Sequence, residues 1–123
     1  MIQDTRNLID HYKYWENDAV KAALNLKRTP LVVAIENLNY DFNIGTVIRN
    51  ANAFNARCVY YLGNKHYDRR GTVGTHHYTD VIRLKAREEL IKLKEEYTFV
   101  GVENSVSDAI SLDKFKWPSN TLL

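Results

Sequence analysis

The sequence predicts an α/β fold built around a mostly parallel sheet with flanking helices. Short apolar segments rich in β-branched residues, such as 31–35, alternate with segments whose apolar residues recur every three or four positions. The short apolar segments are typical of strands that are buried on both faces of a parallel sheet. The 123 residues are 45% hydrophobic and 26% charged, so we expect one α/β domain over 1–123.

The first half of the chain predicts a helix followed by a strand-helix-strand unit. Residues 8–27 have an amphipathic pattern that stops before Pro30, which predicts an N-terminal helical segment within 1–29. The elements expected after it are a strand over 31–35, a polar loop, a helix over 44–54 and a strand over 58–62. This order makes a βαβ unit with a right-handed crossover.

The second half is less regular. Residues 64–79 are polar and contain Gly71 and Gly74, which predicts a long loop of the kind that is usually functional or mobile. The remaining expected elements are a short strand over 81–82, a helix over 87–97, a strand over 98–102 and a strand that starts at Thr121. Because this last strand has only three residues, we expect it to be cut from a longer protein. A naturally short edge strand is the alternative.

Composition and charge narrow the classes of function. Cys58 is the only cysteine, so no internal disulfide can form and a cytoplasmic location is expected. The first ten residues lack the layout of a secretory signal, and no apolar stretch approaches the length of a membrane span. The net charge is only +2, but residues 57–94 hold nine basic and four acidic side chains. Such a segment can steer an RNA backbone, although scattered surface lysines are the commoner cause.

Polar residues gather after the first strand, where open α/β sheets bind their ligands. Asn43 is placed to cap the next helix, and Gly45 lets a ligand or another backbone come close. Arg49 lies one turn further on the same polar face. A guanidinium near the start of a helix can bind an anion or a polarised oxygen atom of a ligand. On these residues alone, a cap, a packing glycine and a solvated arginine are the simpler description.

The order of features strengthens the functional interpretation. The pattern Asn-x-Gly-x-x-x-Arg-x-x-x-x-Phe between two apolar strands resembles the first motif of the SpoU/TrmH-type RNA 2′-O-ribose methyltransferases of the SPOUT class, and consists here of Asn43, Gly45, Arg49 and Phe54. The resemblance covers residues 30–123 and includes 68–78 and 99–104. It implies a SPOUT-like sheet, with a trefoil knot only in a longer native chain. It also implies S-adenosylmethionine as the methyl donor, no metal, a homodimer, and structured tRNA or rRNA as the substrate.

The resemblance assigns roles position by position. Arg49 corresponds to the catalytic arginine and Asn43 to the asparagine that supports it. Because a guanidinium scarcely deprotonates, we expect Arg49 to stabilise a developing 2′-alkoxide rather than to act as a base. The expected cofactor-binding residues are Val102, Glu103 and Asn104. The expected RNA-binding residues are Arg69, Arg70 and Gly45, although an ordinary solvated loop explains the two arginines equally well.

The sequence departs from the family pattern in two places. Asn55 stands where the family usually has glycine, a mild change because asparagine also tolerates a positive φ. The second and third family motifs would follow Leu123, so we expect 30–123 to be an incomplete methyltransferase domain that is inactive by itself. A non-catalytic RNA-binding or dimerisation module is the alternative. His76 and His77 lack partners at ligand spacing, so no metal site is predicted.

Overall fold

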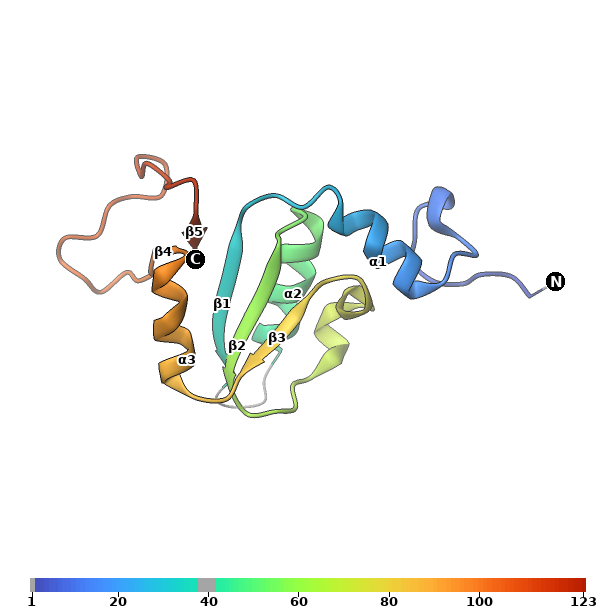
Figure 1. Cartoon of the computed structure of the whole chain (residues 1–123), viewed down its shortest axis with the longest axis horizontal. Helices are drawn as coiled ribbons and strands as arrows, with labels where there is room; N and C mark the ends of the chain where they lie inside the picture. Colours follow the sequence, from blue (N-terminus) through green and yellow to red (C-terminus); the bar gives the residue numbers. More distant parts are fainter. Residues whose placement is uncertain (1, 38–41) are drawn as a thin grey trace.

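The computed structural model describes residues 2–37 and 42–123. Within this part of the chain, five strands form one parallel sheet in the order β3-β2-β1-β5-β4 (Figure 1). The strands are β1 (Val32–Asn37), β2 (Cys58–Gly63), β3 (Val81–Leu84), β4 (Thr98–Phe99) and β5 (Thr121–Leu122). The predicted α/β class with a parallel sheet and flanking helices is confirmed.

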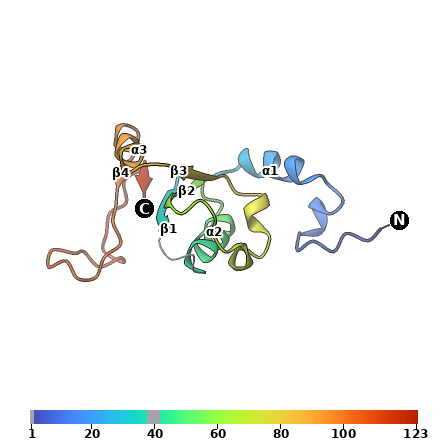
Figure 2. The ribbon, with the colours of Figure 1, turned by 90° about the horizontal axis from the view of Figure 1, so that it is seen from below.

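Helices cover both faces of the sheet (Figure 2). α2 (Asn43–Ala53) packs Ile44 and Ile48 against one face, where Val59 and Tyr61 of β2 are buried. α3 (Arg87–Lys92) and the 3₁₀ turn after it lie on the other face, where Cys58 is buried. Neighbouring strand residues therefore face opposite apolar layers, which explains why the strand sequences are continuously apolar.

The N-terminal helix is shorter than predicted. The expected helix over 8–27 is wrong in its first half, because only α1 (Asn17–Asn25) and a 3₁₀ turn over Asp10–Tyr12 form. Tyr14 has a φ of 67°, and its backbone N–H donates to the carboxylate of Asp4 at 2.7 Å. The hydrogen bonds from Arg6 and Tyr14 hold the pKa of Asp4 well below its usual value. Side-chain bonding to the backbone thus replaces the helix at this point.

The N-terminal segment packs on the loop that follows β2. Tyr12 and Val20 form a buried cluster with Tyr78. Lys21 pairs with Asp80 at 2.7 Å, and the Arg28 guanidinium donates to the Tyr78 carbonyl. The loop between β2 and β3 is therefore held from the N-terminal side of the chain.

The turn after α2 explains the family departure at position 55. Asn55 has a φ of 52°, so this position needs the left-handed conformation that glycine adopts easily and that asparagine tolerates, as predicted. Its side chain also donates to the Lys27 carbonyl at 2.6 Å and accepts from Arg28 at 2.8 Å. Asn55 therefore adopts the left-handed conformation that the turn needs, and its side chain also hydrogen-bonds to the N-terminal segment.

The C-terminal elements are shorter than expected. α3 ends at Lys92 and continues only as a 3₁₀ turn over Leu93–Glu95, and β4 has two residues instead of the expected 98–102. Residues 100–120 form a long, mostly exposed connection. β5 lies between β1 and β4, with the Leu123 N–H donating to the Val32 carbonyl at 2.9 Å. The alternative of a short edge strand is therefore wrong, because β5 is interior.

Candidate functional site

Contacts at the ends of β1 and β2 fix the position of the loop that follows β2. Asn37 is buried, and its Nδ2 donates to the carbonyls of Asn64 at 2.8 Å and His66 at 2.9 Å. Gly63 has a φ of 111°, and a Cβ there would lie 2.6 Å from the Asn37 carbonyl oxygen. Only glycine fits this approach. Sequence reasoning missed Asn37, and the signal was a polar residue directly after an apolar strand.

The start of α2 differs from the expectation. Asn43 is exposed and is the first helical residue, while Phe42 occupies the capping position without a side-chain cap. Phe42 already has helical dihedral angles, and its carbonyl accepts the Thr46 N–H at 3.0 Å. The expected cap at Asn43 is therefore displaced by one residue. The polar loop before it, over 38–41, lies outside the described residues.

Gly45 is covered by the chain's own backbone. It is buried, and a Cβ there would lie 2.9 Å from Cα of Gly71 and 3.0 Å from the carbonyl oxygen of Asp68. The close approach expected at Gly45 is thus made by the 3₁₀ turn over Arg69–Thr72. An RNA contact at Gly45 would require this packing to open.

Arg49 lies beside the same loop. Gly45, Arg49 and Asn52 follow one another at helical spacing along one side of α2. Gly45 contacts Gly71, and the Asn52 side chain accepts from the Thr79 hydroxyl at 3.1 Å, so loop contacts lie on either side of Arg49 along the helix. Arg49 itself is exposed, and no hydrogen bond or ion pair joins its guanidinium to any residue that the structure describes.

The two neighbouring arginines of the loop differ in their contacts. Arg70 donates from Nη2 and Nε to the Asp68 carboxylate at 2.6 and 3.0 Å, and its guanidinium lies 4.9 Å from the centre of the Phe42 ring. These bonds lower the pKa of Asp68. Arg69 instead lies 5.9 Å from the centre of the Tyr67 ring, and no described carboxylate pairs with it. Arg69 is therefore the arginine with charge available to a ligand.

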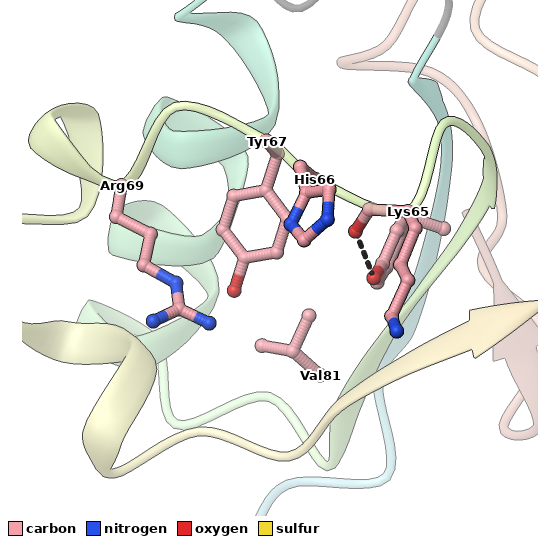
Figure 3. A pocket seen from close by; sticks show the side chains of 6 residues that line it. Lys65, His66, Tyr67, Arg69 and Val81 are labelled. Atoms are coloured by element: carbon pink, nitrogen blue, oxygen red, sulfur yellow. Dashed lines mark hydrogen bonds between the residues drawn. The ribbon is translucent and has the colours of Figure 1, made fainter.

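A cavity of about 580 Å³ opens beside Arg69 (Figure 3). Its walls carry aromatic and basic side chains and are formed by Tyr61, Lys65, His66, Tyr67, Arg69 and Val81. Tyr61 is both part of the core and part of this wall. The run Lys65-His66-Tyr67 was not predicted as functional. Its signal was a basic and aromatic run directly after an apolar strand.

The adjacent histidines form a local cluster at the far end of the loop. The Nδ1 of His76 and the Oγ1 of Thr72 are hydrogen-bonded at 2.6 Å, and the His76 and His77 ring centres lie 4.1 Å apart. Burial and the neighbouring His77 lower the pKa of His76. The described residues contain no group of three or more side chains that could hold a metal ion.

The expected cofactor residues lie on another part of the sheet. Val102 and Glu103 line a cavity of about 440 Å³ beside β4 and β5, whereas Asn104 does not line it. The Glu103 carboxylate accepts from the Ser105 hydroxyl at 2.8 Å and from the N–H groups of Ser105 at 3.0 Å and Asn104 at 2.8 Å, and these bonds lower its pKa. The structure does not bring these residues to Arg49, which lies on α2.

Comparisons with known proteins identify the family of the chain. Over residues 2–37 and 42–123, no helix is long and apolar enough to cross a membrane. No curated protein and no solved structure matches the chain. The SpoU rRNA methylase family matches residues 30–123, which include α2, the loop over 64–79 and all five described strands. The parallel sheet with its flanking helices is SPOUT-like. The chain belongs to the SpoU rRNA methylase family.

Proposed function

We propose that the protein transfers a methyl group from S-adenosylmethionine to a ribose 2′-hydroxyl of a structured RNA, either tRNA or rRNA. The observation that supports this most directly is Arg49. The charged guanidinium of Arg49 is exposed on α2 and has no partner among the described residues. It lies beside the loop over 64–79, inside the region that matches the family. Such a group is suited to an anionic ligand or to charge that develops during a reaction.

Arg49 acts on the oxygen that is methylated. As the ribose O2′ loses its proton to a water molecule, negative charge develops on O2′, and the oxygen then forms the bond to the methyl carbon. S-adenosylmethionine, when bound, supplies the methyl group from a sulfonium whose sulfur keeps the electron pair of the broken bond. The guanidinium of Arg49 stabilises the charge on O2′ and orients the ribose or its phosphate, because it is fixed on a helix and stays protonated. Asn43 supports it from the start of the same helix.

The cavity beside β4 and β5 fits the methyl donor in part. Its volume of about 440 Å³ lies within the usual range for small-molecule sites. Phe99 and Trp117 give it apolar surface, and its lining includes Val102 and Glu103, which the family resemblance assigns to the donor. Asn104 does not line it, so we propose only the first two of these three residues as donor contacts. Since one chain does not bring them to Arg49, we propose that the donor and the Arg49 that acts with it belong to different chains of a homodimer. The homodimer itself is proposed from the family resemblance alone, and a cytoplasmic location from the single cysteine Cys58.

The nature of the product tests this proposal. The full-length protein is incubated with methyl-tritiated S-adenosylmethionine and with total tRNA or rRNA, and the RNA is then digested in alkali. A methylated 2′-oxygen cannot attack the adjacent phosphodiester, so label is expected in alkali-stable dinucleotides. Label in mononucleotides would indicate base methylation and contradict the proposal. RNA binding without any label would instead favour the non-catalytic RNA-binding module.

A further inference from the structure

The cavity of Figure 3 lies at the β3 edge of the sheet, on the face that α2 covers. Tyr61 of β2 and Val81 of β3 form one side of it. The segment 65–69 forms the other side, with Lys65 and Arg69 at opposite ends and the rings of His66 and Tyr67 between them. Its volume of about 580 Å³ is sufficient for a small organic ligand.

The wall made by 65–69 is held in place by several bonds. Asn37 donates to the carbonyls of Asn64 and His66, and the Tyr61 hydroxyl donates to the Lys65 carbonyl at 2.9 Å. The Tyr67 ring also packs edge-on against Tyr61 with ring centres 5.4 Å apart. The cavity is thus formed before any ligand binds, which lowers the entropic cost of binding.

The charge around the cavity favours an anion. Its lining contains Lys65 and Arg69 but no acidic residue. Lys65 and Arg69 are exposed, and none of the carboxylates in the described ranges pairs with either. The next arginine, Arg70, is paired with Asp68. One arginine of the pair is therefore used to hold the loop, and the other faces the cavity.

We propose that this cavity binds one unstacked nucleotide of the RNA, with the base against Tyr67 and His66 and the two flanking phosphates on Lys65 and Arg69. Aromatic rings stack on bases of any sequence, and proteins recognise RNA mainly in loops and single strands where bases are splayed out. The placement of the two cations at opposite ends of the cavity matches a strand that passes across it. The inference rests on the proposed function, because it takes RNA as the substrate.

Charge variants test the phosphate contacts. The affinity of the full-length protein for a fluorescent RNA hairpin is measured over a range of salt concentrations for wild type, Lys65→Ala, Arg69→Ala and the control Lys92→Ala. Lys92 is exposed on α3, on the opposite face of the sheet, and its variant removes the same charge. We expect Lys65→Ala and Arg69→Ala to weaken binding roughly 3- to 10-fold and to reduce the salt slope by about 1 each. Lys92→Ala should stay within about 2-fold of wild type.

Ring variants test the stacking. Tyr67→Leu should weaken binding of the hairpin by roughly 10-fold, whereas Tyr67→Phe, which keeps the ring, should stay close to wild type. Since Tyr67 also packs on Tyr61, thermal unfolding of each variant shows whether it is folded. If Tyr67→Leu does not fold, the two charge variants decide. A hairpin that carries 4-thiouridine in its loop should crosslink to the segment 65–69.

The outcomes separate this inference from the proposed function. If wild type binds and methylates RNA but the Lys65, Tyr67 and Arg69 variants behave like Lys92→Ala, the cavity is not an RNA site and the proposed function stands. If free nucleoside monophosphates displace the hairpin as strongly as a single-stranded oligonucleotide does, the occupant is a free nucleotide and the RNA assignment is overturned. If wild type neither binds nor methylates RNA, both fail.

Discussion

Gly45 of α2 and Gly71 of the loop after β2 lie in direct backbone contact. A Cβ at Gly45 would lie 2.9 Å from Cα of Gly71, and a Cβ at Gly71 would lie 3.2 Å from Cα of Gly45. Two glycines are what allow this loop to rest on the helix that carries Arg49. The contact places the loop that carries Arg69 and Arg70 directly against the helix that carries Arg49.

A side chain at this contact should separate the two elements. Gly45→Ala would push a methyl group into the backbone of Gly71 and Asp68, so we expect the free energy of unfolding to fall by about 1–3 kcal/mol. Gly101→Ala is the matched control, since a Cβ there meets nothing within 4 Å, and its effect should stay within about 0.5 kcal/mol. Urea unfolding of both variants measures the difference. Equal stability of the two variants would contradict the contact.

The two hydrogen bonds that the buried Asn37 side chain donates should contribute measurably to the free energy of unfolding. Asn37→Leu removes the donor to two carbonyl oxygens, so we expect a loss of about 1–3 kcal/mol in the free energy of unfolding. Asn50→Ala is a suitable control, because among the described residues the side chain of this exposed residue bonds only to the Thr46 carbonyl on its own helix, at 2.8 Å. Chemical denaturation at neutral pH compares them. A loss at Asn37 no greater than that at Asn50 would count against the anchoring role.

His76 should make the stability of the loop depend on pH. Burial and the nearby charges of His77 and Arg69 lower its pKa in the folded protein below the ordinary 6.5. The unfolded chain therefore binds the proton first on acidification, and the stabilising contribution is complete above about pH 6.5 and is lost as the pH falls further. Unfolding midpoints between pH 7 and pH 5 should fall more steeply for wild type than for His76→Gln. Parallel profiles would show that His76 does not carry this dependence.

The sequence predicted the central βαβ unit well because its elements depend on local patterns. The strand at 31–35 and the helix at 44–54 were found with small errors in their ends, as β1 and α2. Apolar periodicity and the stop at Pro30 are sufficient signals for such elements. The tolerance of Asn55 for a positive φ was also a local property, and it is confirmed.

The errors come from contacts that no local pattern encodes. The helix expected over 8–27 fails at Tyr14, because Asp4 takes its backbone N–H. Gly45 was correctly expected to allow a close approach, but its partner Gly71 lies 26 residues along the chain and could not be inferred. The anchor at Asn37 and the cavity wall at Lys65 likewise arise only when β1 and β2 pair.

The role proposed for Arg49 is to stabilise the charge that develops on O2′ during methyl transfer, and the turnover of Arg49→Lys in the full-length protein measures this role. Because the Arg49 guanidinium has no partner in the described ranges, this change should leave folding and donor binding intact. Arg87→Lys on α3 is the control, since it keeps a positive charge beside Glu36, with which Arg87 pairs at 3.4 Å. We expect RNA methylation by Arg49→Lys to fall by about 100-fold or more, and that by Arg87→Lys to stay close to wild type. Unchanged turnover in Arg49→Lys would contradict it.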